Sequence, residues 1–296
     1  MRAQAPFGPV VTAVVTPFGA DGSVDQGLFG DLLEHCLAHG STGFVVTGTT
    51  GESPTLSDDE KLALYTTAVD AVAGRAAVIA GATTYDTAHS VRLCTEAEQR
   101  GVDGILAVTP YYSRPPQNAL QVHFRAIADA VSIPVMVYDI PGRTGRAIEL
   151  PTKAELATHP RIVALKDAAD NLKVTTRTIA AMPGFAVYSG DDINTLPMMA
   201  VGAVGVVSVV SHLAGTEIRA MIEAFQSGNV AEAAAMHQRL TPLFDATMDA
   251  EPNPIAVRAG LELLGLPVGP PRLPLLPAQP ATVDRLKGAL ADLGLL

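Results

Sequence analysis

The chain has 296 residues, a length that suits one α/β barrel and does not require two domains. Its formal net charge is -10, so we expect no basic surface for the phosphates of nucleic acid or of an anionic membrane. Hydrophobic residues make up 48% of the chain and charged residues only 17%, which indicates a large core and favours faces hidden in an oligomer. These values favour a small-molecule partner.

No segment of the sequence predicts secretion or membrane insertion. The apolar run near the N-terminus is short and interrupted by prolines, unlike a signal peptide, and no stretch approaches the ~20 apolar residues of a membrane span. Cys36 and Cys94 lie far apart within helical patterns, so we expect two buried thiols rather than a disulfide or a metal site. A cytoplasmic location is predicted.

Short apolar runs alternate along the chain with amphipathic segments, beginning with residues 10–18 and 25–40. The same strand and helix pair recurs at 43–48 and 57–74, 76–83 and 86–101, 104–110 and 116–131, 134–141 and 152–160, 162–168 and 171–184, 185–192 and 193–202, and 203–210 and 216–228. Gly40, Gly74 and Gly101 stand where three of these helices should end.

Eight such pairs predict an α/β fold, a (β/α)8 TIM barrel. Continuous apolar strands, each followed by a helix, are typical of a parallel sheet covered by helices, and eight units close into a barrel. A doubly wound open sheet is the alternative, but the turn after the first strand, "TPFGADGS", is not a glycine-rich phosphate turn. Helical patterns alone follow from residue 230. We therefore divide the chain into a barrel over residues 1–229 and a C-terminal helical appendage over residues 230–296.

Polar side chains gather at the ends of five predicted strands, which read "TGTTGES", "TPYYSRP", "YDIPGRTG", "LKD" and "SGDD". The carboxyl ends of all barrel strands share one face, where barrel enzymes place their chemistry. These side chains therefore predict an active site at that face.

Lys166 ends the apolar run of the sixth predicted strand. Burial there would disfavour the charged ammonium and leave a neutral amine that can attack a carbonyl. A strand end that reaches solvent is the alternative, but the four other polar strand ends favour a reactive lysine. Tyr138 ends the neighbouring strand, where a phenol could transfer protons during imine formation. Lys166 is thus the predicted Schiff-base lysine.

Other side chains at this face could bind carboxylates. Thr49 and Thr50 lie in the turn "GTTGE", whose backbone N–H groups and hydroxyls could converge on one carboxylate. Arg143 in "PGRTG" could bind a second carboxylate through two hydrogen bonds, or it could be an ordinary surface arginine. The pair Tyr111 and Tyr112 is more typical of packing or of an interface than of catalysis.

The sequence lacks the motifs of several other enzyme classes. There is no HExxH motif and no Walker-type loop, and the seven histidines show no metal-ligand spacing, which argues against a metal-dependent aldolase or hydrolase. Asp191 and Asp192 in "SGDD" would lie where a barrel usually binds phosphate. We therefore expect a carboxylate or carbonyl substrate without a phosphate group.

Six fragments together resemble the dihydrodipicolinate synthase family, also called 4-hydroxy-tetrahydrodipicolinate synthases. They are "GTTGES", "VTPYYSRPPQ", "YDIPGRTG", "LKDAADNL", "YSGDD" and "EPNPI", and in order they span nearly the whole chain. The resemblance implies a lyase of class I aldolase type that condenses pyruvate with L-aspartate 4-semialdehyde in the diaminopimelate and lysine biosynthesis pathway. It also implies that no cofactor is needed and that the protein is a homotetramer, a dimer of dimers.

The resemblance also implies a role for each matched residue. Lys166 would form the imine with pyruvate, Tyr138 would donate and accept protons, and Thr49 with Tyr112 would complete a proton relay. In such enzymes the residue at the position of Tyr112 comes from the neighbouring subunit.

Substrate binding is implied for three further positions. Thr50 and the backbone of Val207 would hold the pyruvate end, and Arg143 would bind the carboxylate of aspartate semialdehyde. One departure from the family is Asp139, where many members carry Asn. An N-acetylneuraminate or keto-sugar-acid lyase is one alternative, against which Arg143 argues. A silent oxo-acid binding protein is another, against which the intact reactive residues argue.

The position at which some family members bind the inhibitor lysine differs in this chain. Asp58 and Lys61 replace two expected histidines, and Tyr85 and His89 replace an expected Asn and Glu. Loss of the acidic acceptor predicts weak or absent inhibition by lysine, unless Asp58 supplies a substitute carboxylate.

Overall fold

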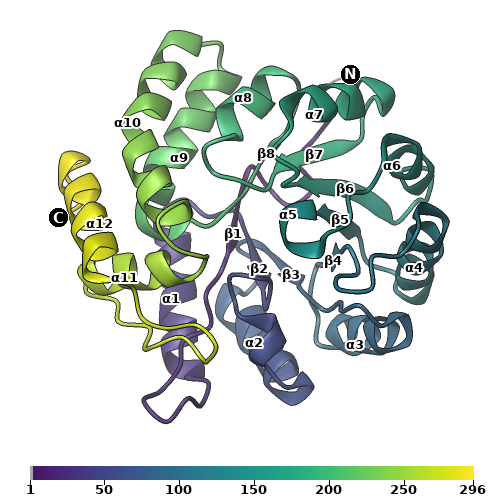
Figure 1. The fold of residues 1–296 in the computed structure, drawn as a ribbon, viewed down its shortest axis with the longest axis horizontal. Coiled ribbons are helices and arrows are strands. Elements are labelled where there is room, and N and C mark those ends of the chain that lie inside the picture. Colours follow the sequence, from purple (N-terminus) through teal and green to yellow (C-terminus); the bar gives the residue numbers. More distant parts are fainter. Residues whose placement is uncertain (1–2) are drawn as a thin grey trace.

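The computed structural model describes residues 3–296 and contains a closed barrel of eight parallel strands (Figure 1). Each strand pairs with the next along the chain, and β8 pairs with β1. The strands are β1 (Val10–Ala13), β2 (Gly43–Val46), β3 (Ala77–Ala80), β4 (Gly104–Val108), β5 (Val135–Asp139), β6 (Ile162–Asp167), β7 (Ala186–Ser189) and β8 (Gly205–Ser208). The predicted (β/α)8 fold is therefore confirmed.

Helices surround this barrel, and further helices follow it in the C-terminal region (Figure 1). The surrounding elements are α1 (Gln26–Ala38), the 3-10 turn η1 (Ser53–Thr55), α2 (Asp58–Val72), α3 (Thr87–Gln99), α4 (Gln117–Ala130), α5 (Pro141–Thr144), α6 (Leu150–Leu156), α7 (Leu172–Ala181), α8 (Thr195–Ala200) and α9 (Ser211–Gln226). The C-terminal helices are α10 (Val230–Met248), α11 (Ile255–Leu263) and α12 (Pro280–Asp292). Contacts of α10 with α8 and α9, and of α11 with α9, attach this region to one side of the barrel.

Local capping explains where several helices begin. Ser57 forms a capping box, because its side chain accepts from the N–H of Glu60 while the Glu60 carboxylate accepts from the N–H of Ser57. Asp25, Asp86 and Asn171 each accept a backbone N–H in the first turn of α1, α3 and α7. These side chains satisfy donors that the helix itself leaves free.

Two elements differ from the sequence prediction. The helix expected at 216–228 begins earlier, at Ser211, with a kink at Ala214. Residues 211–215 are all buried, so the sequence carries no amphipathic period there from which a helix could be predicted. The expected turn "PGRTG" contains the short helix α5, which ends at Gly145 with a left-handed φ of +70°.

The hydrophobic core has two layers, one inside the barrel and a larger one between the strands and the helices. Phe7 fills the barrel at the amino ends of the strands. A Cβ at Gly104 would lie 2.7 Å from the ring of Phe7, so glycine fits best at this position. The filled interior leaves the carboxyl ends of the strands for substrate.

Cys36 and Cys94 are buried and free, as predicted. Within residues 3–296, no helix is long and apolar enough to cross a membrane. Residues 1 and 2, which begin the predicted barrel region and the N-terminal apolar run, lie outside the described residues.

Candidate active site

Lys166 lies near the carboxyl end of β6, between two tyrosines of the neighbouring strands. The strand register pairs Lys166 with Tyr138 of β5 on one side and with Tyr188 of β7 on the other. The lysine is only 5% exposed, and its Nζ lies 4.2 Å from the centroid of the Tyr138 ring. The structure therefore brings together the two residues that the sequence analysis ranked first.

Burial changes the acidity of this lysine. Loss of hydration lowers the pKa of Lys166 to about 8, and the charge of Arg143 acts in the same direction. The charges of Asp192 and Asp191 oppose this shift. A lysine with this pKa is partly neutral near physiological pH, which a nucleophilic amine requires.

Tyr138 is buried against the same lysine, and Thr49 lies close enough to affect its acidity. Burial raises the pKa of Tyr138, whereas the charge of Arg143 and the hydroxyl of Thr49 lower it. The phenol therefore stays protonated and can donate a proton at neutral pH. Lys166 and Thr49 thus both lie beside Tyr138.

The loop after β2 carries Thr49 and Thr50 in a tight backbone turn. Thr47 and Glu52, on either side of the two threonines, both adopt left-handed backbone angles with φ of 56°. A Cβ at Gly81 of the neighbouring strand end would lie 2.6 Å from the carbonyl oxygen of Thr47, so the two loops can meet only at glycine. The glycines of "GTTGE" predicted a tight turn but not this close contact.

The C-terminal region holds this loop in place through residues to which the sequence analysis gave no role. Asn253 Nδ2 donates to Thr50 Oγ1 at 2.9 Å, although 203 residues separate the two. Arg258 forms a buried ion pair with Glu52, with Nη2 and Oε1 2.8 Å apart. The only sequence signal for Asn253 was its place in the fragment "EPNPI".

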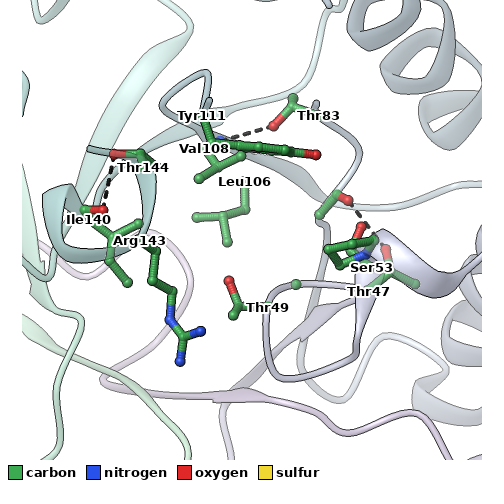
Figure 2. Close-up of a pocket in the computed structure, with 13 residues that line it drawn as sticks. Thr47, Thr49, Ser53, Thr83, Leu106, Val108, Tyr111, Ile140, Arg143 and Thr144 are labelled. Carbon is green, nitrogen blue, oxygen red and sulfur yellow. Dashed lines mark hydrogen bonds between the residues drawn. The ribbon is translucent and has the colours of Figure 1, made fainter. Parts of the chain in front are cut away.

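A cavity of about 240 Å³ opens beside the loop after β2. Of the seven predicted site residues, Thr49 and Arg143 line it, and Figure 2 shows both side chains facing the same space, below Leu106 and Tyr111. Arg143 comes from α5, and its Nη2 lies 3.5 Å from the backbone oxygen of Asn253. This exposed arginine is positioned to receive an anionic group from solvent.

Val207 and Asp192 lie at the neighbouring ends of β8 and β7. Val207 is buried and belongs to the apolar group inside the barrel. The Asp192 carboxylate accepts from the hydroxyl of Ser208 and from the N–H groups of Val209 and Val210. A carboxylate of the protein thus occupies the donors after β8 that could bind phosphate, as the sequence predicted.

Tyr112 is the one predicted catalytic residue that the structure does not bring to the others. Its side chain is 93% exposed, and its backbone has a left-handed φ of 69°. Tyr111 lines the cavity instead and packs edge to face against Tyr85, with ring centroids 5.3 Å apart. Within a single chain, the expected relay of Tyr138, Thr49 and Tyr112 is incomplete.

Three of the four residues at the expected inhibitor position, Asp58, Lys61 and His89, form a polar group between α2 and α3, whereas Tyr85 packs against Tyr111. Asp58 accepts from Arg92 Nη2 at 2.9 Å, and one of its carboxylate oxygens lies 2.9 Å from His89 Nε2. Lys61 is 5% exposed, and loss of hydration lowers its pKa. The carboxylate of Asp58 therefore already has two partners.

Comparisons with known proteins agree with this geometry. The model of the dihydrodipicolinate synthetase family matches residues 6–293. A 4-hydroxy-tetrahydrodipicolinate synthase of Acidothermus cellulolyticus is 50% identical over 290 residues, which are 98% of this chain and 94% of the relative. The structure of a dihydrodipicolinate synthase from Cyanidioschyzon merolae with lysine bound is 45% identical, with a TM-score of 0.96 over 99% of this chain and 100% of the other. A monomeric dihydrodipicolinate synthase variant is 37% identical, with a TM-score of 0.95 over 98% of both chains.

Proposed function

Because the chain belongs to the dihydrodipicolinate synthetase family, we propose that it condenses pyruvate with L-aspartate 4-semialdehyde through a Schiff base to give 4-hydroxy-tetrahydrodipicolinate. This reaction makes the protein a lyase of diaminopimelate and lysine biosynthesis. The observation that carries the proposal is the buried Lys166 beside the ring of Tyr138, because an imine-forming lysine needs a neutral amine and a nearby proton donor.

The reaction begins at Lys166. Its neutral Nζ attacks the ketone carbon of pyruvate, and the carbinolamine loses its oxygen as water to leave a cationic imine. Tyr138 donates and accepts the protons of these steps, and Thr49 shares them. Thr50 and the backbone of Val207 hold the pyruvate carboxylate.

The second substrate then joins the first. Loss of a methyl proton turns the imine into an enamine, whose carbon attacks the aldehyde of aspartate semialdehyde. Arg143 binds the carboxylate of this substrate through hydrogen bonds from its guanidinium group. The substrate amine finally attacks the imine carbon, which releases Lys166 and closes a six-membered ring.

The proton relay is completed in an oligomer. Tyr112 points to solvent in the single chain, so it is free to enter the active site of a second copy. We place the protein in a homotetramer built as a dimer of dimers, with Tyr112 crossing the interface of each dimer. A cytoplasmic location stays a prediction.

Borohydride reduction in the presence of pyruvate tests the assignment. Intact mass should show one pyruvate adduct per chain, and Lys166→Ala should abolish it because the variant lacks the amine that forms the imine. Lys173→Ala, which removes an exposed lysine of α7, is the matched control and should keep the adduct. An adduct that survives Lys166→Ala would place the imine on another residue. Turnover with aspartate semialdehyde, rather than with a sugar acid, separates this function from that of related lyases.

A further inference from the structure

Asp192 is a buried carboxylate that the proposed mechanism does not use. It follows β7 and is only 1% exposed. One oxygen accepts from Ser208 Oγ, and the other accepts from the N–H groups of Val209 and Val210 at 2.9 and 3.2 Å. All three donors are neutral, so they orient the carboxylate without compensating its charge.

Two other buried carboxylates have a cation beside them. Glu52 pairs with Arg258 at 2.8 Å, and Asp139 pairs with Lys153 at 2.7 Å. Asp192 has no ion-pair partner within 4 Å in the part of the chain that the structure describes. A buried charge without a partner is costly, and it calls for a functional reason.

Lys166 is the corresponding cation, because it too is buried without an ion-pair partner among residues 3–296. Its strand, β6, pairs with β7, which leads to Asp192. Two other charged groups also act on this lysine: Asp191, which follows β7 as Asp192 does, and Arg143 of α5. Of these three charges, that of Asp192 has the largest effect on the pKa of Lys166.

Asp167 also has no ion-pair partner among residues 3–296. It is the residue after Lys166 on β6, so its side chain faces the opposite side of the strand. There it accepts from the hydroxyl of Thr175 at 2.8 Å. Among the buried carboxylates of residues 3–296, Asp192 is therefore the one that combines a missing cation with a direct electrostatic effect on Lys166.

We infer that the carboxylate of Asp192 is the counter-ion of the positively charged imine that Lys166 forms during the reaction. The inference rests on the proposed function, because it requires an imine at Lys166. When the carbinolamine loses water, a permanent positive charge appears on Nζ at a position from which water is excluded. A fixed negative charge nearby stabilises that cation without having to reorganise.

The acidity of Asp192 agrees with this role. Burial raises its pKa, whereas the three hydrogen bonds and the charge of Lys166 lower it. The carboxylate is therefore held most firmly in its ionised form when a cation stands beside it. In the resting enzyme the lysine can be neutral, and the charge pair is established as the imine forms. Asp192 is thus a positioning residue that acts through Lys166.

Asp192→Asn tests the inference, because it removes the charge and keeps the size of the side chain. The rate of borohydride-trapped adduct formation should be measured against pH, together with kcat. In the wild type this rate should rise with pH around the Lys166 pKa of about 8. Removal of a nearby negative charge disfavours the ammonium, so the rise should move to lower pH by roughly one unit. The value of kcat should fall on the order of 10²-fold because the cationic imine loses its stabilisation.

These two effects distinguish a counter-ion from a structural residue, since simple structural damage lowers the rate without moving its pH dependence. Asp191→Asn is the matched control: this carboxylate is less buried than Asp192 and acts less strongly on Lys166, so its loss should move the profile less. A folded Asp192→Asn protein with an unmoved profile would overturn the inference. If Asp192→Asn does not fold, Asp192→Ser decides. This variant also removes the charge, so the profile should again move to lower pH, and an unmoved profile overturns the inference. Failure of the wild type to form any adduct would instead refute the proposed function.

Discussion

Asp58 shows how a single carboxylate can lose its capacity to bind a ligand. His89 and Arg92 contact its oxygens. Burial is the largest single effect on the pKa of Asp58 and raises it, but the hydrogen bonds and charges of His89, Arg92 and Lys61 together lower the pKa below its usual value. Lys61 lies nearby and carries the same charge as a lysine ligand would. An effector ammonium would have to displace Arg92 or His89 before it could use this carboxylate.

We therefore predict weak or absent inhibition by lysine. Loss of a charge-assisted hydrogen bond costs roughly 1.5–3 kcal/mol, which is at least about tenfold in affinity. Initial rates at saturating aspartate semialdehyde should stay constant across a lysine titration up to about 1 mM. Clear partial inhibition below that concentration would contradict the prediction, and its loss in Asp58→Asn would then identify Asp58 as the replacement ligand.

The loop after β2 is an element whose shape depends on a distant part of the chain. Glu52 lies in this loop in a left-handed conformation, and Arg258 of α11 pairs with it while donating to the backbone oxygen of Thr16. Asn253 reaches the same loop at Thr50. The C-terminal region therefore fixes the threonines to which we assign substrate binding and proton transfer.

Loss of Arg258 should destabilise the protein much more than loss of a surface arginine. In Arg258→Met the Glu52 carboxylate stays buried without its partner, which should lower the free energy of unfolding by about 3–5 kcal/mol. Arg219→Met is the matched control, because its ion pair with Glu223 is of similar length, at 2.7 Å, but about half exposed. Its loss should cost less than about 1 kcal/mol. Urea denaturation measures both free energies of unfolding. Equal decreases in the two variants would show that the buried ion pair contributes no more to stability than the exposed one.

At the scale of the whole molecule, the exposure of Tyr112 supports our proposal that a second copy completes the site. The side chain of Tyr112 is 93% exposed in the single chain, so it is available to a partner subunit. Its neighbour Tyr111 lines the cavity of its own chain, so consecutive tyrosines face different environments. The division of the chain into residues 1–229 and 230–296 stays a prediction.

Hybrid oligomers can test whether Tyr112 acts across subunits. Tyr112→Phe should lower kcat by roughly 10²-fold, the size expected for a lost proton-transfer group, while the fold persists. Mixed with inactive Tyr138→Phe, it should regain activity, because a hybrid dimer contains one site with both tyrosines intact. Verified hybrids without any recovery would mean that Tyr112 works within its own chain or has no catalytic role.

Much of the fold and part of the site could be predicted from local sequence. Eight apolar runs of β-branched residues, each followed by an amphipathic helix, predict a barrel. A parallel sheet of such strands must be covered by helices, and few folds bury eight of them in this way. The same alternation places Lys166 and Tyr138 at the ends of neighbouring strands, so their proximity follows from strand order and register. The first turn of α9 escaped prediction because it is buried on all sides and shows no period.

Taken alone, the sequence determined the barrel, the face on which polar side chains gather and the position of Lys166 on a buried strand, because each of these depends on patterns within a few residues. Tertiary structure alone decided that Asn253 and Arg258 hold the loop of Thr50, since these contacts join residues more than 200 positions apart. It also decided that the Tyr112 side chain is exposed to solvent and that Asp192 has no cationic partner among the residues that the structure describes. Both depend on how much solvent and charge surround a side chain, and that environment is created only when distant segments pack together.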